Sequence, residues 1–183
     1  MLTPNAADAA AVADCYRLAV FPLQRGGRRP AVAGWQDTAS ADPEALRSWP
    51  DGANIGIACR RSRLVVLDLD VKGNENGVEV FTWHLDRRRE RWPDTLTVTT
   101  PSGGCHVYYR ARAGWTVPSS SGGRTRMGPG IDVRAPGRRL GGYVIGPNSI
   151  VDGKRYDVAV ALPVQTLPVW VAQLIGGRRG NCF

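Results

Sequence analysis

The pattern of hydrophobic and polar residues is organised around one apolar run, residues 64–67, which gives way to two acids separated by a leucine. A leucine and valine run of this length predicts a strand that is buried on both faces. Because side chains alternate along a strand, Asp68 and Asp70 are expected on one face and Leu69 on the other. Taken alone, the acid pair fits two structures equally: a divalent-metal site, or a strand end whose acids are solvated or paired with arginine.

Hydrophobic spacing and turn residues predict an alternation of helices and strands along the rest of the chain. Helices are expected at residues 5–19, 43–49, 78–91 and 167–175, and strands at 20–23, 54–58, 95–99, 106–109, 131–134 and 142–145. The turn at residues 101–104 joins two of these strands into a hairpin, and a second hairpin is expected around Asp152-Gly153. The strand at 54–58 is expected beside the acidic strand, Trp35 in a loop, and His84 on the surface of its helix. The sequence therefore predicts a mixed α/β domain over residues 1–176, with a tail at 177–183.

The charge of the chain indicates the kind of partner. The net charge is +8, and only Lys72 and Lys154 among the 24 basic residues are lysine. Excess positive charge favours nucleic acid or nucleotides, and arginine suits bidentate phosphate contacts. Arginine in place of lysine also fits a GC-rich genome. The excess of positive charge is therefore stronger evidence for a nucleic-acid or nucleotide partner than the choice of arginine. No apolar run reaches the length of a membrane helix and no signal-peptide pattern is present, which predicts a cytoplasmic protein without a membrane partner.

The four cysteines, Cys15, Cys59, Cys105 and Cys182, are scattered without paired spacing. Structural zinc sites and disulfide frameworks both use cysteines at short, regular spacings. We therefore expect no zinc site, and a reducing compartment.

Three short elements carry residues suited to phosphoryl chemistry, each at the edge of a predicted strand or hairpin. They are Asp68-Leu69-Asp70, Ser102-Gly103-Gly104-Cys105-His106 and Ile131-Asp132-Val133-Arg134. Glycine amides allow close approach of the backbone to an anion, and a histidine that donates a proton could hold a phosphate oxygen. Each element also has a structural interpretation: the glycines form only a turn, His106 is a satisfied strand residue, and Asp132 pairs with Arg134. The occurrence of all three in this order favours a catalytic site.

The order of these motifs resembles the bifunctional DNA primase/polymerase (prim-pol) domain of the archaeo-eukaryotic primase superfamily, found in phage and plasmid replication proteins. That family carries an acidic pair on an apolar strand, a Gly-rich turn that ends in histidine, and a third acid on a later strand. The resemblance spans residues 10–175, and one departure is Gly104, where many members have serine. Flanking segments are also similar: Phe21-Pro22-Leu23, Arg29-Pro30, Gly34-Trp35, Asn54-Ile55-Gly56-Ile57 and residues 142–149.

The resemblance implies a primase-like α/β (α+β) core, in which an RRM-like mixed sheet packs against a second α/β unit and the active site lies in the cleft between them. Asp68, Asp70 and Asp132 would hold two Mg²⁺ or Mn²⁺ ions, and the zinc module of some relatives would be absent. His106 would bind the phosphates of the incoming nucleotide. Further implied contacts to the nucleotide come from Ser102, Gly103, Gly104, Arg134 and Arg29.

By the same resemblance, the function is that of a DNA primase and polymerase, a template-dependent nucleotidyltransferase of phage or plasmid replication in the cytoplasm of a bacterial host. Its partners would be a single-stranded DNA template, a primer and ribo- or deoxyribonucleoside triphosphates, with a helicase domain if the chain is part of a longer replicase. Two alternatives remain open: a metal-dependent nuclease or phosphodiesterase that uses the same acids, and a non-catalytic nucleic-acid-binding module.

Overall fold

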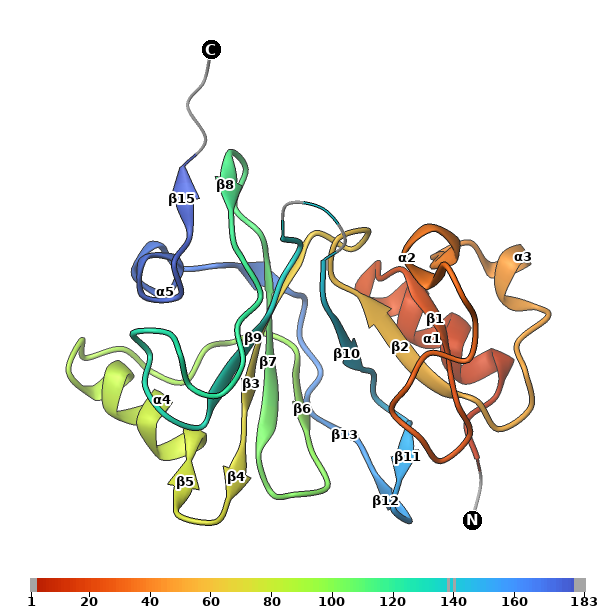
Figure 1. The fold of residues 1–183 in the computed structure, drawn as a ribbon, viewed down its shortest axis with the longest axis horizontal. Helices are drawn as coiled ribbons and strands as arrows, with labels where there is room; N and C mark the ends of the chain where they lie inside the picture. Colours follow the sequence, from red (N-terminus) through yellow and green to blue (C-terminus); the bar gives the residue numbers. More distant parts are fainter. Residues whose placement is uncertain (1–2, 138, 140, 180–183) are drawn as a thin grey trace.

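Two β-sheets share a hydrophobic core in the centre of the molecule, and helices flank them on both sides (Figure 1). The computed structural model describes residues 3–137, 139 and 141–179. The helices are α1 (Ala6–Tyr16), α2 (Trp35–Thr38), α3 (Pro43–Leu46), α4 (Gly77–Asp86) and α5 (Val169–Leu174). The first three lie on the side of the smaller sheet, and α4 and α5 lie on the side of the larger one. The predicted mixed α/β class is confirmed.

The larger sheet has the strand order β13–β6–β7–β3–β9, with every neighbouring pair antiparallel. Its strands are β3 (Leu64–Leu69), β6 (Thr97–Thr99), β7 (Cys105–Arg110), β9 (Ile131–Arg134) and β13 (Asp157–Val160), and β14 (Gln165–Thr166) pairs in parallel with β7. The apolar run forms β3, and both of its faces are buried as predicted. Leu64 and Val66 pack into the core shared with the smaller sheet, whereas Val65 and Leu67 pack with residues of α4 and α5.

The smaller sheet has the order β1–β2–β10, built from β1 (Val20–Leu23), β2 (Asn54–Ala58) and β10 (Tyr143–Ile145). The expected position of residues 54–58 beside the acidic strand is wrong, because β2 pairs with β1 and β10 in this separate sheet. A continuous apolar run predicts that a strand is buried on both faces, but it does not determine which other strand pairs with it.

Three short ladders complete the strands: β4 (Val71–Lys72) with β5 (Glu75–Asn76), β8 (Trp115–Thr116) with β15 (Arg178–Arg179), and β11 (Ile150–Val151) with β12 (Lys154–Arg155). The last pair is the predicted hairpin, and its turn residues Asp152 and Gly153 both have positive φ, 52° and 74°. β15 falls within residues 177–183, the segment assigned from the sequence to a tail.

Helix starts match the sequence better than helix ends. Asn5 caps α1 as predicted: its side chain accepts hydrogen bonds from two backbone N–H groups of the first turn, and the Asn5 backbone N–H donates to the Asp8 carboxylate. The predicted helix at 43–49 ends earlier, at Leu46, and the helix at 78–91 ends at Asp86. Trp35 begins α2 instead of lying in a loop.

The expectation of a surface position for His84 is wrong, because its side chain is buried and its Nε2 atom lies 2.8 Å from the Met127 carbonyl oxygen. Across residues 3–137, 139 and 141–179, no helix has the length and apolar character needed to cross a membrane.

Candidate active site

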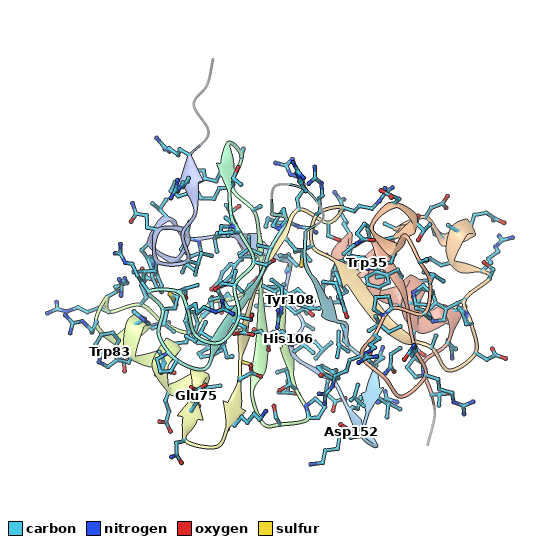
Figure 2. The ribbon with its side chains drawn as sticks, viewed as in Figure 1. Trp35, Glu75, Trp83, His106, Tyr108 and Asp152 are labelled. Atoms are coloured by element: carbon cyan, nitrogen blue, oxygen red, sulfur yellow. The ribbon has the colours of Figure 1, made fainter. Side chains whose placement is uncertain are left out.

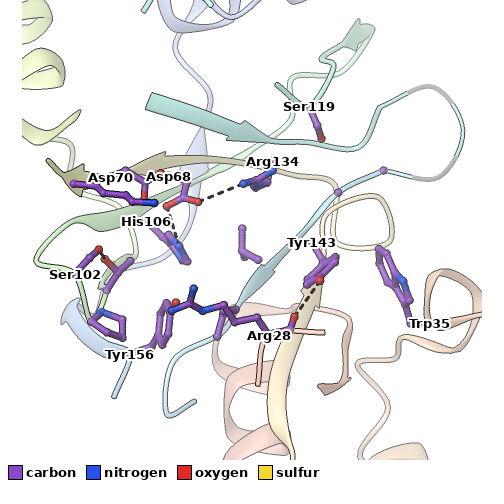
Figure 3. A pocket seen from close by; sticks show the side chains of 17 residues that line it. Arg28, Trp35, Asp68, Asp70, Ser102, His106, Ser119, Arg134, Tyr143 and Tyr156 are labelled. Atoms are coloured by element: carbon purple, nitrogen blue, oxygen red, sulfur yellow. Dashed lines mark hydrogen bonds and ion pairs between the residues drawn. The ribbon is translucent and has the colours of Figure 1, made fainter. Parts of the chain in front are cut away.

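A pocket of about 820 Å³ opens between the two sheets, beside the acidic end of β3 (Figure 3). One wall belongs to the larger sheet and its loops, and it carries Asp68, Asp70, His106 and Arg134. The opposite wall comes from β10 and from the N-terminal part of the chain. The pocket therefore occupies the cleft in which the sequence resemblance puts the active site.

The pairing register of three strands brings Asp68, His106 and Asp132 side by side. β3 lies between β7 and β9, and Asp68 is directly opposite His106 on one neighbour and Asp132 on the other. Residues directly opposite each other on antiparallel strands point to the same face, with Cβ atoms about 4.5–5.5 Å apart. Two carboxylates and an imidazole from distant parts of the sequence thus form a row across the sheet.

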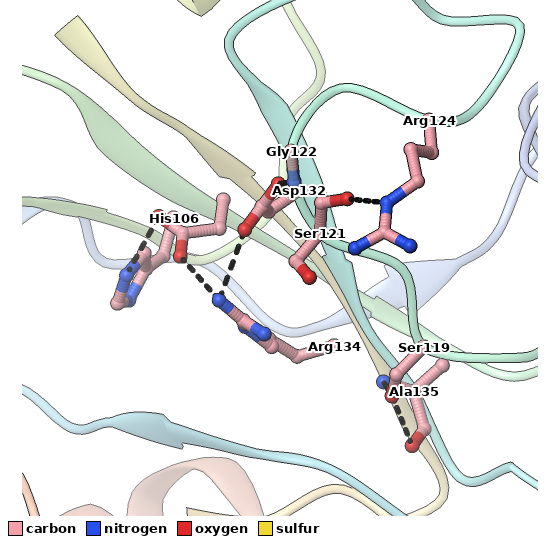
Figure 4. Close-up of polar contacts among 9 residues, drawn as sticks. His106, Ser119, Ser121, Gly122, Arg124, Asp132, Arg134 and Ala135 are labelled. Atoms are coloured by element: carbon pink, nitrogen blue, oxygen red, sulfur yellow. Dashed lines mark hydrogen bonds and ion pairs between the residues drawn. The ribbon is translucent and has the colours of Figure 1, made fainter. Parts of the chain in front are cut away.

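Arg134 lies between the two carboxylates of this row (Figure 4). Its Nη2 atom is 3.0 Å from Asp132 Oδ2 and 3.8 Å from Asp68 Oδ2. The other oxygen of Asp132 accepts a 2.6 Å hydrogen bond from the Gly122 backbone N–H, and Asp68 Oδ1 lies 3.2 Å from His106 Nε2. Pairing of the acids with arginine, one of the alternatives that the sequence left open, is therefore present: Arg134 pairs with both Asp68 and Asp132.

The surroundings of Asp68 and Asp70 shift their pKa values in opposite directions. Burial by itself raises the pKa of Asp68, but His106 and Arg134 beside the carboxylate outweigh burial and hold that pKa below its ordinary value. Burial also raises the pKa of Asp70, and the negative charges of Asp68 and Asp132 raise it further, so that it stays above its ordinary value. The charged form is stabilised at Asp68 and disfavoured at Asp70.

Backbone contacts fix Asp70 at the end of β3. Its N–H donates to the Gly130 carbonyl and its carbonyl accepts from the Gly77 N–H, both at 2.8 Å. The backbones are so close that a Cβ atom at Gly77 would lie 2.1 Å from the Gly130 oxygen, and one at Gly104 would lie 2.0 Å from the Leu69 oxygen. Close packing at the end of β3 thus requires Gly104 whether or not it contacts a phosphate.

His106 is buried, and its two ring nitrogens have different surroundings. Nε2 faces Asp68, whereas Nδ1 has no hydrogen-bond partner among the residues that the structure describes. The imidazole also lines the pocket, with the ring centroid of Tyr156 5.7 Å from its own. His106 is therefore not a strand histidine whose two ring nitrogens both have hydrogen-bond partners, which was the alternative to a functional role.

The chemistry of the acids decides whether a divalent cation fits here. Within the described part of the chain, no group of three His, Cys, Asp or Glu side chains is arranged to hold a metal ion. The Arg134 guanidinium takes the place between Asp68 and Asp132, so a cation already bridges these carboxylates. Burial is the largest cause of the raised pKa of Asp70, and the negative charges of the nearby Asp68 and Asp132 raise it further. Carboxylate oxygens are preferred ligands of Mg²⁺ and Mn²⁺, so the chemistry of these acids suits such an ion, while Arg134 occupies the place between Asp68 and Asp132.

The other residues predicted to contact a nucleotide divide into two groups. Ser102 and Arg134 line the pocket, whereas Gly103, Gly104 and Arg29 are not among the described residues that line it. Arg28, immediately before Arg29, is in the lining instead. The two arginines lie in the same basic turn, and the sequence contains no periodic signal there that would distinguish them.

The wall opposite the acids is aromatic, and none of its residues was predicted from the sequence to take part in the site. Trp35 stacks on Phe21 with ring centroids 4.5 Å apart and meets Tyr143 edge-on at 5.1 Å. The Tyr143 hydroxyl donates a 3.0 Å hydrogen bond to the Arg28 carbonyl, which holds the basic turn against β10. Trp35 and Tyr143 both lie in the flanking segments noted above, and that similarity was the signal that could have identified them.

Comparison with known families gives one match over most of the chain. The family model described as the N-terminal domain of bifunctional DNA primase/polymerase, Prim-Pol, matches residues 9–170. The matched segment contains β3, β7, β9 and β10, the strands around the pocket. A search of curated proteins finds no match.

Proposed function

We infer the function from family membership: this chain belongs to the bifunctional DNA primase/polymerase family. The proposed reaction is template-dependent transfer of a nucleotide to a 3′-hydroxyl group during replication of a phage or plasmid genome. The observation that carries the proposal is the row of Asp68, His106 and Asp132 across three strands. Asp68 and His106 line a pocket large enough for a nucleotide, together with Asp70, and Asp132 lies beside that lining, in contact with Arg134. The net charge of +8 supports attraction of a nucleic-acid template.

Each side chain of the row has a proposed part in the reaction. Asp68, Asp70 and Asp132 would hold the divalent cations that members of this family use. Two Mg²⁺ or Mn²⁺ ions, when bound, would lower the pKa of the 3′-hydroxyl and neutralise the triphosphate and the departing pyrophosphate. His106 and Ser102 are proposed to contact the phosphates of the incoming nucleotide, and the contact between His106 Nε2 and Asp68 keeps the imidazole turned toward the acids.

The test is incorporation of labelled nucleotides on a single-stranded DNA template, with ribo- and deoxyribonucleotides supplied separately. We expect extended product with Mg²⁺ or Mn²⁺ and none after excess EDTA, because the acids need a bound cation to assist the transfer. Absence of product with every metal and nucleotide would contradict the proposal. Cleavage of the DNA without added nucleotide would support the nuclease alternative, and unchanged DNA binding in EDTA without any turnover would support the binding-module alternative.

Arg134→Ala is expected to strengthen Mn²⁺ binding about tenfold in the absence of nucleotide. The guanidinium competes with a metal ion for Asp68 and Asp132, and one hydrogen bond to a charged group contributes about 1.5–3 kcal/mol, enough for a factor of ten or more. The same variant is expected to raise the KM for nucleotide, since Arg134 released by the metal is proposed to meet the triphosphate. Titration of Mn²⁺ followed by electron paramagnetic resonance measures the first effect.

Lys72→Ala is the matched control for this titration. Lys72 lines the same pocket and carries the same charge, but within the described chain it forms no ion pair with these carboxylates. A gain in Mn²⁺ affinity as large in Lys72→Ala as in Arg134→Ala would mean that general electrostatics, and not competition at the carboxylates, causes the change.

A further inference from the structure

Trp83 is the most exposed large apolar side chain among the described residues, at 53%. It lies on α4, at the periphery of the molecule and away from His106 (Figure 2). With Val80, Met127 and Pro129 it lines a second pocket of about 550 Å³. An exposed tryptophan over an apolar hollow marks a surface that binds a partner more often than one that faces water.

The surroundings of this second pocket are basic. The Arg87 guanidinium lies over the Trp83 ring, 4.9 Å from its centroid, and Arg126 lines the pocket. Glu79 is the single acid among the described lining residues. Further arginines follow α4 directly: Arg88, Arg89 and Arg91. A flat ring with guanidinium groups around it suits single-stranded nucleic acid, whose bases stack on aromatic side chains and whose phosphates meet arginine.

One loop connects the second pocket to the catalytic pocket. Residues 117–130 link β8 to β9, and the Met127 carbonyl of this loop is held by His84 Nε2 of α4 at 2.8 Å. Earlier in the same loop, Ser119 lines the catalytic pocket and the Gly122 N–H donates to Asp132. β9 is the last strand of its sheet, and Ser120 of this loop pairs with Val133 along its outer side, so the loop runs over the edge of the sheet from the catalytic pocket to the second pocket.

We propose that the Trp83 pocket is a second contact for the single-stranded template, in which one base stacks on the Trp83 ring and Arg87 and Arg126 meet the adjoining phosphates. The inference rests on the proposed function, because it places the template on a path to the catalytic acids. Arg87 and Arg126 favour a single-stranded nucleic acid over an apolar protein segment as the partner, because an apolar segment would bring no negative charge to these two side chains.

The experiment is a fluorescence-anisotropy titration of the chain against two labelled oligothymidylates, one long enough to reach both pockets and one that fills only the catalytic pocket. Trp83→Ala is expected to weaken binding of the long oligomer about tenfold, the loss typical of one base stack, and to leave the short oligomer unchanged. Trp83→Phe keeps a ring and is expected to retain most of the affinity. Glu79→Gln removes the single acid and is expected to tighten binding of the long oligomer.

Leu162→Ala is the matched control, because it shortens another exposed apolar side chain outside both pockets. Equal affinity of wild type and Trp83→Ala for the long oligomer would overturn the inference and assign the pocket to a protein partner. An equal loss for the short oligomer would also overturn it, since Trp83 would then act through the fold. Failure of the wild type to incorporate nucleotides on a short template counts against the catalytic proposal alone, because Trp83 takes no part in that assay.

Discussion

Asp68→Asn and Asp70→Asn are each expected to reduce templated incorporation by at least about a thousandfold. Both acids line the pocket, and each variant removes one negative charge from the proposed cation site. Charge stabilisation by a bound metal contributes several kcal/mol, and about 4 kcal/mol corresponds to a factor of a thousand in rate. Template binding, measured by anisotropy, is expected to stay close to wild type because the basic surface is unchanged.

The two variants are expected to change stability in opposite directions. The lowered pKa of Asp68 means that its charged form stabilises the fold above the ordinary carboxyl pKa, and that this contribution is lost as the pH falls through the lowered value. At neutral pH, Asp68→Asn should therefore cost about 2 kcal/mol, the contribution of a hydrogen bond to a charged group. The raised pKa of Asp70 means that its contribution falls as the pH rises through the raised value, so Asp70→Asn should stabilise the fold at neutral pH.

Denaturant unfolding at neutral and acidic pH measures both shifts, with Asp51→Asn, an exposed acid in a turn, as the control. The difference between the variants should shrink at a pH below both carboxyl pKa values. Incorporation by Asp68→Asn at the wild-type rate would remove the catalytic assignment. Stability changes of equal sign in the two variants would contradict the charge distribution described for the pocket.

Gly77→Ala is expected to lower stability by about 3 kcal/mol and the melting temperature by about 9 °C, and to reduce incorporation as well. Gly77 is the first residue of α4, where helix propensity alone would favour alanine. The tertiary contact reverses this preference, because the added Cβ would lie 2.1 Å from the Gly130 carbonyl oxygen and 3.1 Å from the Asp70 nitrogen. Relief of that overlap must move the backbone that holds Asp70.

Thermal unfolding and the incorporation assay measure the two effects of Gly77→Ala. Gly27→Ala is the matched control, since its Cβ would meet only Gln24, at 3.2 Å, in a surface turn with ordinary φ. A variant at Gly77 as stable and as active as the one at Gly27 would show that the close packing around Asp70 is not needed.

The sequence by itself determined the local elements and the chemistry of the candidate residues. The apolar run of β3, the Asn5 cap of α1 and the Asp152-Gly153 turn follow from side-chain periodicity and backbone preferences, which act over a few residues. The order of motifs also identified the family, because this order can be read along the sequence without knowing which strands are neighbours in the sheet.

Only the tertiary structure decided how these pieces meet. It placed β2 in a separate sheet, put Arg134 between Asp68 and Asp132, and selected Arg28 over Arg29 for the pocket wall. It also showed that Gly77 is fixed by the backbone of Gly130 and not by its helix. The physical reason is that pairing and close packing between distant segments depend on the free energy of the whole fold, whereas periodicity along one segment reports only which of its sides is buried.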